Sequence, residues 1–235
     1  MSAEGFFGFD DLKWLKSKKK TQTKIGLGRP IRTVDLFAGC GGLALGISEW
    51  CRRKKMQHRC EFASEWDEEV LAIFKANIQP VEYSSEDIEM LFNGKLNASR
   101  LTKLELSFLD KYPNAFRPDL LTGGPPCQGH SDLNNHTRRG DARNNLYFRM
   151  VRAAFVLKPR SIIIENVTTV IHSKEEVVQK SKKKLEKMGY HVSEKILKGV
   201  EFGVPQVRSR HFLIASLDSS PDFASLDKCV RTEAR

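Results

Sequence analysis

Short apolar runs alternate with segments of helical periodicity along most of the chain, and this alternation restricts the fold more than any other feature. The runs that predict strands are 32–37 (RTVDLF), 60–65 (CEFASE), 118–123 (PDLLTG) and 161–167 (SIIIENV). The segments that predict helices are 42–53, 68–78, 85–92, 146–159 and 174–190. Strands that alternate with helices build a parallel sheet with helices on both faces. The sequence therefore predicts an α/β fold with a doubly wound, mostly parallel sheet.

The rest of the chain gives weaker signals. Residues 191–199 and 210–217 predict a hairpin-like pair of strands, whereas 93–117 shows no clear pattern. Because the sequence contains no internal repeat and no low-complexity linker, we expect one domain, over residues 31–218. We expect residues 1–30 to form a mobile basic leader whose aromatic patch, GFFGFDDLKWL, could dock on a neighbour, and residues 219–235 to form a tail.

The charge of the chain favours a polyanionic partner. Its 39 lysines and arginines exceed its 29 acidic residues, which gives a formal net charge of +10 and a pI of about 9.4. Nucleic acid is the simplest such partner. The lysine runs at 16–20 and 180–187 need not bind a polyanion, because a solvated tail and a solvated helix face would have the same composition.

Cysteine usage and hydropathy exclude several classes of protein. The five cysteines are an odd number without a Cys-x-x-Cys pair, which argues against a disulfide scaffold and a zinc site, and we expect no bound metal. The longest apolar runs are far shorter than the roughly 20 residues that cross a bilayer, and no signal-peptide region follows the N-terminus. We therefore expect an intracellular protein that does not enter a membrane and that, in a bacterium, lies in the cytoplasm near the nucleoid.

A glycine-rich loop, DLFAGCGGLALG, directly follows the first predicted strand. Backbone N–H groups at such a turn and helix N-terminus suit an anionic group of a nucleotide-like ligand. The loop also fits the dinucleotide fingerprint, and Glu65 lies near its acidic position, so NAD and S-adenosylmethionine both remain open here. Glu65 could accept hydrogen bonds from a ribose, and Trp66 could stack on an adenine. The alternatives are a tight turn, a helix-capping carboxylate and a tryptophan in the core.

A second turn, GGPPCQG, places Cys127 just beyond another predicted strand. Two glycines followed by two prolines exclude helix and strand, so the cysteine lies on a stiff turn. Open α/β sheets carry their chemistry at the carboxyl ends of their strands. The polar and cationic loop that follows, 128–144, could close over DNA and contact phosphates, although a merely solvated loop would have a similar composition.

Five motifs in fixed order resemble the 5-methylcytosine DNA methyltransferases. They are DLFAGCGG, SEWD, GGPPCQGHS, IIIENV and PQVRSRHF, and the resemblance extends from Arg32 to Leu217. It implies the Rossmann-like fold of S-adenosylmethionine-dependent methyltransferases. It also implies methyl transfer to carbon 5 of cytosine in double-stranded DNA, with base flipping, as part of a restriction-modification or defence system.

The chemistry of the reaction agrees with this resemblance. Carbon 5 of cytosine is a weak nucleophile, so an enzyme must first add a nucleophile at carbon 6, and Cys127 is the candidate. By resemblance, Glu165 donates a proton toward N3 of the base, which an apolar surround of this carboxyl would favour. Arg210 holds the base carbonyl and orients Glu165, with Arg208 in support.

The resemblance also marks residues for the cofactor and for DNA. For S-adenosylmethionine these are Phe37, Gly39, Gly42, Glu65, Trp66, Asp87, Ile88, Pro126 and Leu146. For DNA they are Gln128, Ser131, Arg138, Arg139 and Arg143. His130 stands where the family commonly has an aromatic residue, so the role of that position is open.

The family normally continues into a target-recognition domain and a last motif, neither of which we find in these 235 residues. We therefore expect the catalytic part of a split enzyme, with a second chain carrying target recognition, or a fragment. A transfer-RNA methyltransferase of the same fold is an alternative, although its usual Cys-Phe-Thr segment is absent from the sequence. A non-catalytic subunit is another, against which the presence of Cys127, Glu165 and Arg210 argues. An NAD oxidoreductase has no support beyond the glycine loop.

Overall fold

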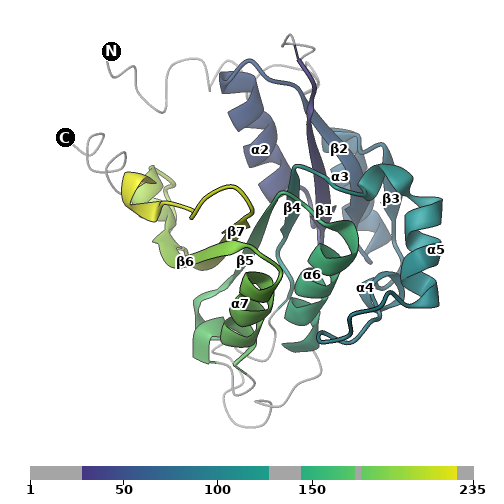
Figure 1. The fold of residues 1–235 in the computed structure, drawn as a ribbon. Coiled ribbons are helices and arrows are strands. Elements are labelled where there is room, and N and C mark those ends of the chain that lie inside the picture. Colours follow the sequence, from purple (N-terminus) through teal and green to yellow (C-terminus); the bar gives the residue numbers. More distant parts are fainter. Residues whose placement is uncertain (1–27, 127–143, 173–175, 227–235) are drawn as a thin grey trace.

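The structure is a computed structural model of the chain, and it describes residues 28–126, 144–172 and 176–226. These residues form a seven-stranded sheet with the order β3-β2-β1-β4-β5-β7-β6 (Figure 1). The strands are β1 (Ile31–Leu36), β2 (His58–Ser64), β3 (Glu82–Ser84), β4 (Leu120–Gly123), β5 (Ser161–Val167), β6 (His191–Lys198) and β7 (Ser209–Ser216). Strands β1 to β5 pair in parallel, and β7 lies antiparallel to both β5 and β6. The predicted doubly wound, mostly parallel α/β fold is confirmed.

Six α-helices and three short 3-10 helices connect the described strands. The α-helices are α2 (Gly42–Arg53), α3 (Glu68–Ile78), α4 (Ile88–Leu91), α5 (Lys103–Lys111), α6 (Asn144–Leu157) and α7 (Val177–Lys187). The 3-10 helices are η1 (Pro113–Ala115), η3 (Thr168–His172) and η4 (Gly199–Phe202). None of the described helices is both long and apolar enough to cross a membrane.

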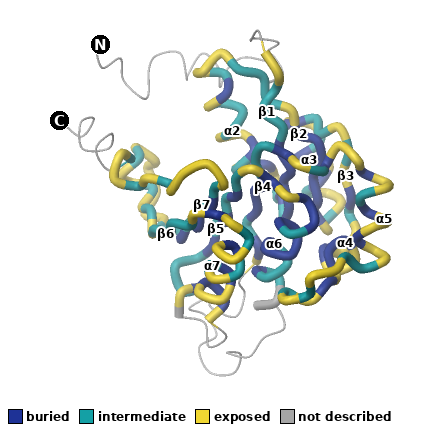
Figure 2. Tube along the Cα trace, viewed as in Figure 1, coloured by how far each residue is buried: buried dark blue, intermediate teal, exposed yellow. Residues whose placement is uncertain are grey.

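Helices pack on both faces of the sheet. Phe62 and Ala63 are neighbours on β2 and therefore point to opposite faces. Phe62 belongs to the larger core cluster, to which α4, α5, α6 and α7 contribute, whereas Ala63 packs with Phe74 of α3 in a smaller cluster. Figure 2 shows the central strands β1 and β4 as largely buried. This burial holds in place the carboxyl ends of these strands, where the candidate active site described below lies.

Two elements were missing from the sequence prediction. Strand β3 has only three residues, too few for a period-two pattern to show. Helix α5 lies in the segment that showed no clear pattern, yet it begins with a capping box in which Thr102 accepts from the Glu105 amide and Glu105 accepts from the Thr102 amide. The Ser/Thr-x-x-Glu signal was therefore readable in the sequence.

Two arginines of α6 attach the segment between α4 and α5 to the rest of the domain. Arg152 and Glu105 form a fully buried ion pair at 2.6 Å, and Arg152 also donates to the carbonyls of Ala98 and Arg100. One turn earlier, Arg149 donates to the carbonyls of Phe92 and Gly94 and to Glu89. These bonds hold α4 and the segment that follows it at a fixed place relative to α6.

Candidate active site

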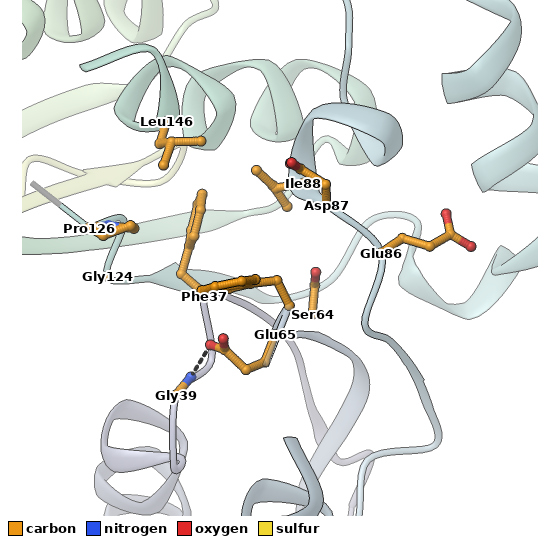
Figure 3. Close-up of a pocket in the computed structure, with 11 residues that line it drawn as sticks. Phe37, Gly39, Ser64, Glu65, Glu86, Asp87, Ile88, Gly124, Pro126 and Leu146 are labelled. Atoms are coloured by element: carbon orange, nitrogen blue, oxygen red, sulfur yellow. Dashed lines mark hydrogen bonds between the residues drawn. The ribbon is translucent and has the colours of Figure 1, made fainter. Parts of the chain in front are cut away.

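A cavity of about 630 Å³ lies at the carboxyl ends of the parallel strands (Figure 3). Its walls come from the residues that follow β1, β2, β3 and β4 and from the starts of α4 and α6. The lining residues are Phe37, Gly39, Ser64, Glu65, Trp66, Glu86, Asp87, Ile88, Gly124, Pro126 and Leu146. In open α/β sheets this edge is where ligands bind. The cavity is therefore the leading candidate for the cofactor site.

The glycine loop turns sharply from β1 into α2. Gly41 is the N-cap of α2, with a left-handed φ of 94°, and a Cβ atom there would lie 3.1 Å from the ring of Phe74. Only glycine meets both the conformation and the packing at this position. Phe37 also has a positive φ, of 52°, and its ring points toward Leu146 across the cavity (Figure 3). The turn thus places an aromatic wall at the end of β1.

Glu65 connects the first two loops of the cavity. Its carboxylate accepts from the Gly39 N–H at 2.9 Å and from the Asp67 N–H at 3.2 Å. The capping carboxylate of α3 is Asp67, which accepts from the Glu69 and Val70 amides, so the alternative that assigned this task to Glu65 is wrong. Each carboxylate oxygen can accept a further hydrogen bond. Glu65 can therefore support the loop and contact a ligand.

The other marked residues divide between a polar rim and an apolar wall. Trp66 is 75% exposed at the cavity, which rules out the alternative of a core tryptophan. The Asp87 side chain caps α4 by accepting from the Glu89 amide at 2.8 Å. Ile88 is buried, and Leu146 of α6 forms the wall opposite.

The cavity carries negative charge. Its charged lining residues are Glu65, Glu86 and Asp87, and no lysine or arginine is among the described residues that line it. Glu86 points away from the cavity in Figure 3 and lies 3.5 Å from Lys111, which leaves the other two carboxylates to act on a ligand. Such a site favours a cationic ligand and disfavours a diphosphate.

Asp35 lies buried in β1, two residues before Phe37. One of its carboxyl oxygens accepts from the Thr122 hydroxyl at 2.9 Å, and the other is buried without a hydrogen-bond partner in the described structure. Burial raises the pKa of Asp35 to about 7, against the hydrogen bond from Thr122, and the negative charge of Glu65 adds to the rise. Nothing in the sequence motif separated Asp35 from an ordinary strand residue.

A second cluster of charged groups lies at the end of β5. The Arg210 Nε lies 2.9 Å from Oε1 of Glu165, and the Arg208 guanidinium lies 4.0 Å from the same oxygen. Arg210, which is predicted to orient Glu165, is thus paired with it, and Arg208 lies farther from the same carboxylate. The surround of Glu165 is charged and not apolar, because β7 pairs antiparallel with β5 and brings the arginines beside it.

The turn before Cys127 packs directly on this cluster. Asn166 donates to the Pro125 carbonyl at 3.0 Å, and a Cβ atom at Gly124 would lie 3.1 Å from Oε2 of Glu165. Gly124 and Pro126 also line the cavity, so the turn separates the cavity from the charged cluster. Cys127 itself lies outside the described residues, as do Gln128, Ser131, Arg138, Arg139 and Arg143.

Most residues marked for the cofactor meet at one place. Gly42 is the exception, because it begins α2 and does not line the cavity, whereas the other eight do. Ser64, Glu86 and Gly124 line the cavity but were not marked. Ser64 and Gly124 lie at or just after strand ends, and that position was a usable signal.

Comparisons with known proteins place this arrangement in a family. The family model described as C-5 cytosine-specific DNA methylase matches residues 31–230. The type II methyltransferase M1.BsuMI of Bacillus subtilis is 38% identical over 225 residues, which cover 96% of this chain and 52% of the relative. M.NgoBV of Neisseria gonorrhoeae is 32% identical, and the match covers 83% of this chain and 43% of the relative. The chain spans about half the length of the curated relatives that it matches.

Solved structures agree on the fold. A protein encoded in an E. coli prophage and described as a DNA modification methyltransferase superposes with a TM-score of 0.61 at 25% identity, over 83% of this chain and 49% of that one. The Dnmt2 methyltransferase of S. pombe gives a TM-score of 0.60 at 21% identity, over 85% of this chain and 54% of that one. Because the family model matches most of this chain, the chain belongs to the C-5 cytosine-specific DNA methylase family.

Proposed function

We propose that residues 31–218 are the catalytic part of an enzyme that transfers a methyl group from S-adenosylmethionine to carbon 5 of cytosine in double-stranded DNA. The observation that carries this proposal is the position of the Gly124–Pro126 turn. On one side the turn borders the cavity, and on the other it packs on Glu165, which is paired with Arg210. A cofactor site and a base-binding site would therefore meet at Cys127, the next residue.

The cavity fits S-adenosylmethionine better than NAD. Its volume of about 630 Å³ is in the range of cofactor sites. Glu65 and Asp87 would hold the hydroxyls and the cationic groups, while Trp66, Phe37 and Ile88 would pack against the adenine. The diphosphate of NAD would meet only carboxylates among the charged groups described there. When bound, S-adenosylmethionine supplies a methyl group activated by its sulfonium.

The residues around the turn would then activate the base. The Cys127 thiolate adds to carbon 6, and the electron pair of the 5,6 double bond becomes available at carbon 5 for the methyl group. Glu165, oriented by Arg210, supplies a hydrogen bond or a proton at N3, which lowers the barrier to this addition. Loss of the carbon 5 proton and release of the thiolate restore the ring. Gln128, Ser131, Arg138, Arg139 and Arg143 would contact the DNA around the flipped base.

We further propose that sequence-specific recognition needs protein outside these 235 residues, from the same or a second chain, because the relatives are about twice as long. Such an enzyme would work inside the cell, in a restriction-modification or defence system. The relatives of B. subtilis and N. gonorrhoeae, described as type II methyltransferases, favour this role over the transfer-RNA alternative.

The proposal is tested by the transfer of a labelled methyl group from S-adenosylmethionine. Duplex DNA and total transfer RNA are offered as separate acceptors in the presence of any chain needed for recognition, with Cys127→Ser as the control. We expect label in DNA cytosine that is lost in Cys127→Ser. Label in transfer RNA alone would select the alternative substrate. Label in DNA that is unaffected by Cys127→Ser would remove the proposed mechanism.

A further inference from the structure

Helix α7 carries most of its lysines on one flank. Four of them lie within an arc of about 100° around the helix axis, namely Lys180, Lys183, Lys184 and Lys187. This stripe borders α6, because the Lys184 Nζ lies 5.9 Å from the ring centre of Phe155. The other flank of α7 faces β6, where Lys182 pairs with Glu194 at 3.7 Å. The helix therefore presents a row of positive charge beside α6.

The segment between α4 and α5 supplies a second row of positive charge. Residues 93–102 contain Lys95 and Arg100 and no acidic residue. Arg152 of α6 holds this segment, since it donates to the carbonyls of Lys95 at 3.4 Å and of Arg100 at 2.7 Å. The Arg152 guanidinium lies 4.7 Å from the ring centre of Phe155. The ring of Phe155 therefore lies between the two rows.

Helix α6 forms the surface between the rows. Phe148 and Phe155 are seven residues apart and so lie on one side of this helix, and both are only partly buried. Figure 1 shows α7 and the segment after α4 on opposite sides of α6, over the same face of the sheet. We use the name basic face for the two rings and five charged residues, which are Lys95, Arg100, Lys180, Lys183 and Lys187.

The charges of the basic face are not neutralised within the described structure. All five charged residues are exposed, and none of them pairs with a carboxylate among the described residues. Two carboxylates of the adjoining helices already have partners, since Glu105 pairs with Arg152 and Glu89 with Arg149. Like charges three or four residues apart disfavour a helix, yet α7 gathers them on one flank. Such a surface attracts a polyanion.

The residues that follow β7 lie on the opposite side of the sheet from the basic face. Ser193 of β6 donates to the Pro221 carbonyl at 2.9 Å, whereas its neighbour Glu194 points toward α7. Neighbouring residues of a strand point to opposite faces. The chain spans about half the length of its relatives. Protein outside these 235 residues can extend the domain on the side of Pro221 while the basic face stays open.

We propose that the basic face binds the phosphate backbone of duplex DNA, independently of base sequence and outside the site of the target base. The α7 lysines extend over about 10 Å, and duplex DNA carries one charge per roughly 1.7 Å of its axis. The inference goes beyond the proposed function and rests on it only in the choice of DNA as the polyanion. Such a contact keeps the enzyme on DNA while it searches for its target sequence.

The salt dependence of DNA binding tests the proposal. Fluorescence anisotropy follows a labelled duplex of random sequence, without S-adenosylmethionine and with any chain needed for recognition present. One double variant, Lys180→Gln/Lys183→Gln, removes two charges from α7, and another, Lys95→Gln/Arg100→Gln, removes two from the segment after α4. Each should weaken binding roughly 10-fold at about 0.1 M salt. Each should also reduce the slope of log K against log salt concentration by about 2.

The matched control is Lys54→Gln/Lys55→Gln, which removes two exposed charges at the end of α2, on the other face of the sheet. It should change the affinity by less than about 2-fold and leave the slope unchanged. An equal effect of the control would assign the binding to total charge and overturn the proposal. Unchanged slopes in both variants of the basic face would also overturn it, as would a loss of affinity for transfer RNA alone. No methyl group is transferred in this assay, so its result is separate from that of the labelled-methyl experiment.

Discussion

Gly124 and Glu165 pack so closely that a Cβ atom at position 124 would lie 3.1 Å from Oε2 of the glutamate. The glutamate cannot withdraw freely, because Arg210 holds its other oxygen at 2.9 Å. The second glycine of GGPPC therefore lets the turn approach the carboxyl that is proposed to contact the base. Position 123 requires glycine for a different reason, since a Cβ at Gly123 would lie 2.7 Å from the Leu36 carbonyl oxygen.

Gly124→Ala tests this contact. We expect the added methyl to shift Glu165 and to lower methyl transfer by roughly 10²-fold, because small displacements of a positioned group cost this much. The free energy of unfolding should change by less than about 1 kcal/mol, since only a side chain must move. The matched control is Gly46→Ala, where a Cβ has open space in a helix. Equal activity of both variants would contradict the positioning of Glu165 by the turn.

Arg210 and Arg208 should differ in their effect on covalent capture. Arg210 bonds Glu165 at 2.9 Å, whereas Arg208 lies at 4.0 Å and is half exposed. With DNA that carries 5-fluorocytosine, and with any chain needed for recognition present, we expect Arg210→Ala to reduce the rate of adduct formation by about 10²-fold. Arg208→Ala should reduce it by less than about 10-fold. The reverse order would exchange their assigned roles.

The cavity predicts selective binding of a cationic cofactor. Glu65→Gln should weaken binding of S-adenosylmethionine at least about 10-fold, because it removes a charge and disturbs the Gly39 loop. Glu86→Gln is the control, since this residue also lines the cavity but its side chain points outward. Calorimetry with S-adenosylmethionine and with NAD measures both effects. Tighter binding of NAD would contradict the assignment of the cavity.

The buried ion pair between Arg152 and Glu105 should contribute strongly to the free energy of unfolding. Both side chains are almost fully buried, so Arg152→Met leaves an unpaired buried carboxylate, which costs about 3–5 kcal/mol. Arg160→Met breaks an exposed pair with Asp218 and should cost less than about 1 kcal/mol. Urea denaturation of the two variants gives the comparison. Similar losses would show that the α6 arginine is not a stability determinant.

Two buried groups should give opposite pH dependences of stability. Burial lowers the pKa of His58 to about 4, so its contribution is lost as the pH falls from 6.5 toward 4, by about 3 kcal/mol in total. Burial raises the pKa of Asp35 to about 7, so its contribution is complete below pH 3.8 and is lost as the pH rises through 7. Asp35→Asn should therefore flatten the loss of stability between about pH 4 and 7. An unchanged profile in urea titrations would show that Asp35 is already ionised.

The sequence predicted the sheet and the cavity lining well for a physical reason. Strand ends in a parallel sheet meet at one edge, so Phe37, Glu65 and Pro126 had to lie near one another once the strands were identified. The residues that lie opposite one another on neighbouring strands were harder to predict. The antiparallel β7 brings Arg210 beside Glu165, and no local pattern specifies that pairing. Asp35 could not be predicted either, because its burial depends on Thr122 from a strand 87 residues away.

The most direct test of the account reads the modified base across a whole genome. The gene is expressed with its natural neighbours in a host without cytosine methylation, and bisulfite sequencing is compared between the natural protein and Cys127→Ser. The account predicts 5-methylcytosine at one recurring short sequence, which disappears in Cys127→Ser. Methylation that persists in Cys127→Ser, or methyl groups found on adenine instead, would contradict it.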